Sequence, residues 1–195
     1  MENVVATQAE FSGPTRVTRN LEERLIVRFP GLFRRLSALI YRRLSRDSRL
    51  RRALLRRQVV SGWAAVNRRD FELMLVRYAA DVTYEFHTGV EELGISGTIR
   101  GHREMRDTFG AMREGLTWKV TPALMLDLGA SLLVLGHIRV SGPQSGVNLD
   151  GEFAQLMTIV NGLVANEQDF RSWQEGLAAA GLDPKAVPVP RPVSS

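Results

Sequence analysis

Cysteine is absent from the 195 residues of this chain. Without it, neither a disulfide framework nor a thiolate metal site can form, which fits a cytoplasmic protein without requiring that location. The three histidines, His87, His102 and His137, lack the close spacing of metal ligands. The glycine-rich segments lack both the G-x-G-x-x-G pattern and the phosphate-binding loop pattern. We therefore expect neither a metal nor another cofactor.

Long apolar runs are also missing. No stretch approaches the ~20 apolar residues of a membrane-spanning helix. The first residues, MENVVATQAEFSG, lack the apolar core of a signal peptide. The sequence therefore predicts a cytoplasmic protein.

Positive charge is concentrated in one part of the chain. Twelve arginines and a single acid, Asp47, lie from Arg24 to Arg57, which gives this segment +11. Because the whole chain carries +5, the remainder carries −6. The segment could lie on an anionic membrane, bind nucleic acid, or pack on the domain with an arginine-rich solvent face. We favour packing for the segment as a whole, and for the helix over residues 32–46 packing and an exposed arm stay open. Nucleic acid is disfavoured because no known binding motif accompanies the charge.

The C-terminal half has the pattern of a sheet. Four apolar runs follow one another, at residues 118–128, 132–140, 147–160 and 163–170. Asn161-Gly162 separates the last two, and this pair favours the tight turn of a β-hairpin because both residues accept positive φ. We predict a meandering antiparallel sheet.

Helical patterns precede this sheet. We predict helices over residues 32–46, 48–67, 71–78 and 102–113, a strand over 81–86, and a last helix over 174–180. In the first helix six apolar residues share one arc of a helical wheel: Leu32, Phe33, Leu36, Leu39, Ile40 and Leu44. The order of elements predicts an α+β fold, a curved antiparallel sheet wrapped around helices with an internal pocket.

The chain divides into four segments. We expect a flexible N-terminal segment over residues 1–30, an arginine-rich amphipathic helical extension over 31–49, a folded domain over 50–181, and a disordered proline-rich tail over 182–195.

The folded segment resembles a known family. The stretches RRALLRRQVVSGWAAVNRRDFELMLVRYAADVTYEF, GTIRGHREMRDTF, FAQLMTIVNGLV and EGLAAAGL resemble, in this order, the SnoaL-like branch of the nuclear transport factor 2 superfamily. The resemblance implies a cystatin-like cone, often dimeric through the outer face of its sheet, whose cavity holds small, often apolar molecules. Polyketide cyclases, limonene-type epoxide hydrolases and ketosteroid isomerases belong to that superfamily.

Tyr84 and Asp169 match two positions of the epoxide hydrolases. Tyr84 matches the tyrosine of their Y-x-N motif, although Phe86 replaces the asparagine; ketosteroid isomerases carry their general-base aspartate at the Phe86 position. Asp169 matches their water-activating carboxylate, and Glu167 shares its face of the strand. Tyr84 could instead be a tyrosine at the core edge. The cyclases place an acid–base aspartate slightly later, where this chain has Phe170-Arg171-Ser172.

His137 and Arg139 stand where the epoxide hydrolases have R-x-D. They alternate on one predicted strand and therefore share a face. His137 could replace the missing acid, since histidine titrates near neutral pH. Alternatively, the two could be polar residues at the pocket mouth or at a dimer edge, or Arg139 could simply pair with Asp169. His87 is a weaker candidate, and His102 is expected to be a surface residue at a helix start.

Two functional hypotheses follow. In the first, the domain is a hydrolase, cyclase or isomerase for a small apolar ligand, with Asp169 as base, Tyr84 as positioning residue, and His137 and Arg139 as electrophilic partners. Asp169 should then contact Arg139 or His137. In the second, it is a non-catalytic ligand-binding or dimeric interaction domain. Because an uncovered apolar sheet face usually marks an interface, we also expect a homodimer.

Overall fold

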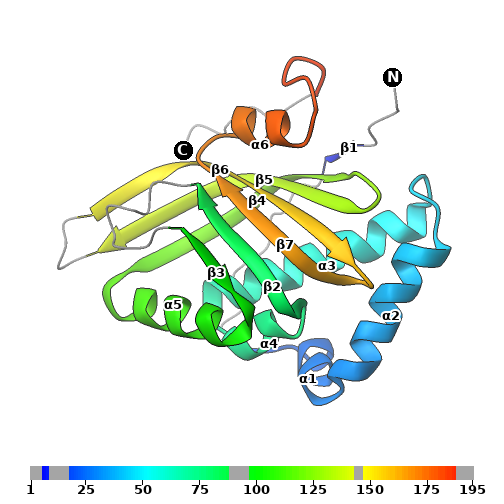
Figure 1. The fold of residues 1–195 in the computed structure, drawn as a ribbon, viewed down its shortest axis with the longest axis horizontal. Helices are drawn as coiled ribbons and strands as arrows, with labels where there is room; N and C mark the ends of the chain where they lie inside the picture. The colour runs from blue at the N-terminus through cyan, green and yellow to red at the C-terminus, as the bar shows by residue number, and fades with distance from the viewer. Residues whose placement is uncertain (1–5, 9–17, 88–96, 143–146, 188–195) are drawn as a thin grey trace.

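The computed structural model describes residues 6–8, 18–87, 97–142 and 147–187, which form a curved sheet with helices on both faces (Figure 1). The helices are α1 (Leu21–Arg28), α2 (Pro30–Arg43), α3 (Arg49–Arg68), α4 (Phe71–Leu75), α5 (Gly101–Gly115) and α6 (Trp173–Ala179). The strands are β1 (Ala6–Gln8), β2 (Tyr78–His87), β3 (Thr98–Arg100), β4 (Thr117–Asp127), β5 (Ser131–Gly142), β6 (Val147–Val160) and β7 (Leu163–Phe170). No helix within these residues is both long and apolar enough to cross a membrane.

The predicted meander is present. Strands β4 to β7 pair antiparallel in chain order within a sheet ordered β1-β4-β5-β6-β7-β2-β3. The turn between β6 and β7 has the predicted positive φ angles, 53° at Asn161 and 78° at Gly162. One pairing differs from the prediction, because β2 runs parallel to β7. These two strands are far apart in the chain and no hairpin joins them, so turn signals could not reveal their relative direction.

Helix α3 fills the concave face of the sheet. Ser48 caps its first turn, and Leu55, Val59 and Trp63 recur every four residues on its buried side. Near its end, Asn67 exchanges two hydrogen bonds of 2.8 Å with the backbone of Val120 on β4. The main core therefore lies between α3 and the inside of the cone.

Helix α6 covers the outer face of the sheet. Trp173 and Leu177 pack with Leu124, Leu133 and Leu135 in a second buried cluster. The expected homodimer was based on an uncovered apolar outer face, and α6 covers these leucines of that face. The homodimer itself stays a prediction. Val187 is also buried in this cluster, so the segment expected to be disordered from residue 182 is packed at least to Val187; residues 188–195 lie outside the described residues.

Helix α1 lies within the segment that we expected to be flexible. Asn20 and Glu23 form a reciprocal capping box at its start. Glu23 is only 2% exposed, lies 3.0 Å from the guanidinium of Arg68, and accepts a hydrogen bond of 3.1 Å from Ser61. This buried carboxylate therefore links α1 to α3. The residues of the capping box were the signal in the sequence that could have identified this helix.

Helix α2 buries only one side of its predicted apolar arc. Ser37 is 1% exposed, and Phe33 and Ile40 pack against the main core. Leu32, Leu36 and Leu39 are 58%, 52% and 53% exposed, so this part of the apolar arc faces solvent. A helix resting on a domain buries roughly one side, and the six-residue arc was wider than that side.

The turn between β6 and β7 supports α2 at one end of the cone. Arg42 donates a hydrogen bond of 2.6 Å to Asn161, and the α-carbon of Gly162 approaches the backbone of α2 at Ser37 and Ala38. A side chain at Gly162 would collide with that backbone. Glycine is therefore required at residue 162 both by its φ and by this close approach.

We expect Gly162→Ala to destabilise the fold by about 2–3 kcal/mol, combining the cost of a left-handed alanine with the displacement of α2. Gly181→Ala is the matched control, because Gly181 has a similar φ of 71° but no neighbour near its α-carbon. Thermal unfolding of both variants measures the difference. Equal losses of stability would show that α2 does not rest on this turn.

Candidate functional site

A cavity of about 530 Å³ occupies the inside of the cone. Aromatic side chains make up much of its wall: Phe33, Trp63, Phe86, Phe109, Trp118 and Phe153. Apolar residues of β4 to β7 complete it. A cavity of this size and lining suits a small, largely apolar molecule.

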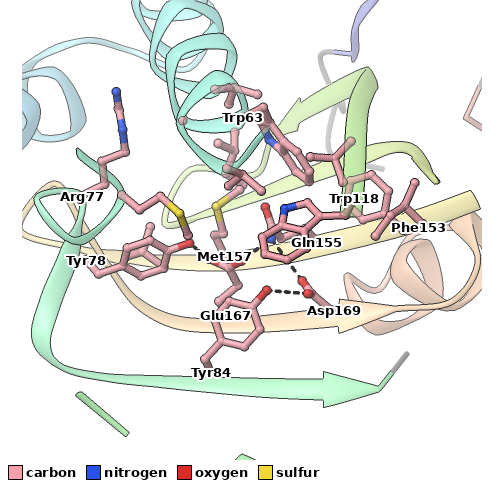
Figure 2. A pocket seen from close by; sticks show the side chains of 18 of the residues that line it. Trp63, Arg77, Tyr78, Tyr84, Trp118, Phe153, Gln155, Met157, Glu167 and Asp169 are labelled. Carbon is pink, nitrogen blue, oxygen red and sulfur yellow. Dashed lines mark hydrogen bonds between the residues drawn. The ribbon is translucent and has the colours of Figure 1, made fainter. Parts of the chain in front are cut away.

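Two carboxyl groups on β7 project into this apolar space. Glu167 pairs across the sheet with Met157 and Tyr84, and Asp169 pairs with Gln155 and Phe86. Because directly paired residues share a face of a sheet, this register brings the polar residues to the concave side. Figure 2 shows Glu167 and Asp169 between Tyr84 and Gln155, with Trp63, Trp118 and Phe153 beyond them.

Two phenols and one amide hold these carboxyl groups. Tyr78 donates to Glu167 over 2.7 Å, and Tyr84 donates to Asp169 over 2.5 Å. The Nε2 atom of Gln155 bridges the pair, donating to Asp169 over 3.1 Å and also to Glu167 (Figure 2). We call these five residues, Tyr78, Tyr84, Gln155, Glu167 and Asp169, the polar centre.

Burial sets the protonation of the polar centre. Glu167 is completely buried, and burial, with the neighbouring charge of Asp169 as the next cause, raises the pKa of its carboxyl well above the ordinary value. Burial also raises the pKa of the Tyr78 and Tyr84 hydroxyls, with the charges of Glu167 and Asp169 acting in the same direction. Both tyrosines therefore remain hydrogen-bond donors at neutral pH, and the raised pKa of Glu167 favours its protonated form.

This shift predicts how Glu167→Gln changes stability with pH. Because the folded pKa of Glu167 is raised, the contribution of this group is full below the ordinary glutamate pKa and is lost as pH rises toward the folded value. Glutamine cannot ionise and keeps a similar shape. We therefore expect the melting temperature of Glu167→Gln, relative to the natural chain, to increase as the pH rises above the ordinary glutamate pKa of about 4.3. A difference that stays constant with pH would contradict the raised pKa.

Tyr84 and Asp169 lie together on the cavity wall, but His137 and Arg139 do not join them. The side chain of His137 packs against Trp173, with the ring centroids 5.0 Å apart, beneath α6. Arg139 pairs with Asp150 at 2.6 Å, and its side chain is 67% exposed. The predicted contact of Asp169 with Arg139 or His137 is therefore wrong.

The reason is the parity of β5. Leu132, Val134 and Ile138 of this strand pack in the main core, so the odd-numbered residues that alternate with them face outward. The sequence showed that His137 and Arg139 share a face with Leu133 and Leu135. It could not show that this face points away from the cavity, where α6 covers its leucines.

The other positions considered in the sequence, Phe86, His102 and His87, are not part of the polar centre. Phe86 lines the cavity and packs on Tyr84, with centroids 4.6 Å apart. His102 begins α5 with Nε2 3.1 Å from the carbonyl oxygen of Tyr78. The side chain of His87 lies outside the described residues. Within the described part of the chain, no three acidic or histidine side chains are grouped as metal ligands would be.

Sequence reasoning missed Tyr78, Gln155 and Arg77. Tyr78 was placed at the end of a helix, although it begins β2. Gln155 could have been noticed as the single amide among the inward residues Phe153, Met157 and Ile159 of β6.

Arg77 also lines the cavity, but its side chain leads away from Asp169 (Figure 2). It donates a hydrogen bond to Ser61 over 2.9 Å and lies over the ring of Phe33. Burial lowers its pKa to about 10, so it stays charged at neutral pH.

Comparisons with known proteins agree with this geometry. The sequence model of the SnoaL-like domain matches residues 59–167. No curated protein matches the sequence significantly. An NTF2-like protein from Burkholderia pseudomallei is similar in structure, with 24% identity, a TM-score of 0.54, and alignment over 63% of this chain and 93% of that one.

Two further solved structures contain small molecules. TerC, co-crystallised with polyporic acid, is 20% identical with a TM-score of 0.54, over 65% of this chain and 95% of that one. A protein with a ketosteroid isomerase-like fold from Catenulispora acidiphila, in complex with trimethylamine, is 20% identical with a TM-score of 0.51, over 67% of this chain and 98% of that one.

Proposed function

The chain belongs to the SnoaL-like domain family, and from this premise we propose that its cone binds a small, largely apolar molecule and catalyses a proton transfer on it, with Asp169 as the general base. Family membership and the α+β cone confirm the predictions made from the sequence. The superfamily that the sequence resembles includes cyclases, isomerases and epoxide hydrolases, so family membership does not determine one reaction. The role of Asp169 and the reaction are therefore our proposal.

The observation that carries this proposal is the unequal pair of carboxyl groups. Glu167 is sealed from solvent, and burial raises the pKa of its carboxyl, whereas Asp169 is partly exposed and lines the cavity. Two neighbouring titratable groups with different environments are a recurrent sign of acid–base chemistry. Asp169 is thus the carboxyl group that can reach a ligand, while Glu167 is buried beside it.

The surrounding residues define the step. Asp169 would take a proton from the ligand, or from a water molecule next to it, and the electron pair of the broken bond would stay on the ligand or water oxygen. Tyr84, bonded to Asp169, orients the carboxylate and presents a phenol at the cavity wall. Tyr78 and Gln155 hold Glu167 in place. The apolar walls exclude water and increase the strength of these interactions.

Binding without catalysis is the second candidate. It is favoured by the hydrogen bonds within the polar centre, because tyrosine and glutamine donors already satisfy both carboxyl groups. The structures that contain polyporic acid and trimethylamine support ligand binding by this fold, and they do not distinguish the two candidates.

Hydrogen exchange on bound ligands separates the two candidates. A panel of small cyclic ketones would be incubated with the protein in D₂O, and loss of their α-hydrogen signals followed by NMR. A parallel panel of apolar epoxides would be followed for diol formation. Displacement of an apolar fluorescent probe from the cavity measures binding independently. Accelerated exchange or hydrolysis supports the enzyme; probe displacement with no reaction of any bound compound supports the binding protein.

A further inference from the structure

Exposed apolar side chains gather on the N-terminal helices. Ten large apolar residues are exposed within the described part of the chain, and eight of them lie between residues 21 and 60. These eight are Leu21, Leu25, Phe29, Leu32, Leu36, Leu39, Leu50 and Val60. Such a concentration on adjacent helices usually marks an interaction surface.

The outward stripe of α2 has helical spacing. Leu32, Leu36 and Leu39 are separated by four and three residues, so they lie on the same side of the helix. Ser37, which is 1% exposed, is on the opposite side and accepts a hydrogen bond from Gln58 of α3. Helix α2 is thus apolar both toward the cone and toward solvent, and a helix on the surface of a monomer requires only the first of these faces.

Helix α1 repeats the arrangement. Leu21 and Leu25 are 75% and 50% exposed and lie one turn apart, whereas Ile26 and Glu23 face the domain. Phe29, between the two helices, is 52% exposed. We call Leu21, Leu25, Phe29, Leu32, Leu36 and Leu39 the outward row.

Arginines flank the outward row. Arg24 and Arg28 on α1 and Arg34, Arg35 and Arg43 on α2 are all exposed. The acids of α1 do not neutralise them, because Glu23 is buried against Arg68, and Glu22 pairs with Arg57 of α3. Helix α2 itself contains no acid. The two helices therefore present leucine side chains within a strongly cationic surface.

We propose that this surface docks the protein on an anionic lipid bilayer, with the outward row entering the interface and the flanking arginines pairing with lipid phosphates. Arginine beside leucine and phenylalanine on a helix is the pattern of interfacial helices. A second copy of the chain fits less well, because a two-fold interface would bring the arginine-rich surface against itself. Nucleic acid would satisfy the arginines but would leave the leucines against polar phosphates.

Docking would bring the membrane close to the cavity. The inward side of α2 contributes Phe33 and Tyr41 to the cavity wall. Its outward side carries Leu32, Leu36 and Leu39. A single helix therefore separates the proposed lipid surface from the cavity, although the docking proposal does not depend on the proposed reaction.

Vesicle co-sedimentation of the full chain tests the proposal. We expect binding to phosphatidylcholine vesicles that contain phosphatidylglycerol, and little binding to phosphatidylcholine alone. The triple variant Leu32→Ser, Leu36→Ser and Leu39→Ser should bind at least about tenfold more weakly, because the apolar part of interfacial binding is removed. Its melting temperature should not fall, since these side chains are exposed. Arg34→Glu with Arg35→Glu should also weaken binding, and added salt should weaken that of the natural chain.

The double variant Leu149→Ser and Val160→Ser is the matched control. Among the residues that the structure describes, these are the two exposed large apolar ones outside the N-terminal helices, at 46% and 51% exposure. Their replacement should leave vesicle binding unchanged. Three results would overturn the proposal: equal binding to both kinds of vesicle, unchanged binding of the triple-leucine variant, or no vesicle binding at all. In the last case, sedimentation velocity and duplex DNA binding would show whether a second copy or nucleic acid uses this surface instead.

Discussion

Asp169→Asn is expected to slow ligand proton exchange by about 10²–10⁴-fold, which is the usual contribution of a general base. Asparagine has the size of aspartate, and its one oxygen can still accept the hydrogen bond from Tyr84, while the amide of Gln155 keeps Glu167 as its acceptor. Asparagine cannot, however, take up a proton. Probe binding and the melting temperature should therefore change little. Exchange rates by NMR, probe displacement and thermal unfolding would be measured on the same preparation.

Asp81→Asn is the matched control for this substitution. Asp81 is an exposed aspartate of β2 that does not line the cavity. The control should retain the full exchange rate. If Asp169→Asn exchanges hydrogen as fast as the control, Asp169 is not the base. If it unfolds at a much lower temperature, the carboxylate serves the fold, as the binding candidate requires.

Arg51→Ala is expected to cause the largest loss of stability. Arg51 is 2% exposed and binds the equally buried Asp127 with two hydrogen bonds, of 2.6 and 2.9 Å. It also donates to the backbone carbonyls of Tyr41, Leu44 and Gly129, and so joins the α2–α3 connection to the β4–β5 turn. Removing one partner of a buried ion pair costs about 3–5 kcal/mol, which lowers the melting temperature of a domain this size by roughly 6–20 °C.

Arg139→Ala provides the contrast, because the Arg139–Asp150 pair has a similar distance but is exposed on both sides. Such a pair contributes about 1 kcal/mol or less. Replacing both buried partners, with Arg51→Met and Asp127→Leu, should recover part of the loss, because no charge is then left buried alone. A loss for Arg51→Ala no greater than that for Arg139→Ala would contradict the structural role of Arg51.

Local signals in the sequence were sufficient for most elements of the fold. Asn161-Gly162 identified the hairpin because both residues adopt positive φ. The helix predicted over residues 48–67 corresponds to α3, whose first turn is capped by the side chain of Ser48. The same kind of signal, Asn20 with Glu23, was present for α1 but was not used. The parallel pairing of β2 with β7 had no local signal, since it depends on how distant segments meet.

The site was predictable only in part. The alternation of side chains along a strand shows which residues share a face, but not which face points into the cavity. On β7 the polar residues Glu167 and Asp169 face inward, and on β5 the polar residues His137 and Arg139 face outward, although both pairs interrupt apolar strands. What decides the direction on β5 is α6, whose Trp173 and Leu177 give the outer face its own apolar layer. The polar centre also depends on Gln155, whose alternation with apolar residues was visible in the sequence but whose partner, Asp169, follows from the register of β6 and β7.

The central claim is that burial raises the pKa of Glu167 well above the ordinary value, beside Asp169 on the cavity wall. Carboxyl ¹³C NMR during a pH titration tests this most directly, with Glu167→Gln and Asp169→Asn used to assign the two signals. We predict that the Glu167 signal changes from that of a protonated acid to that of a carboxylate at a pH well above the ordinary range of glutamate. A Glu167 signal that titrates within that ordinary range would contradict the account.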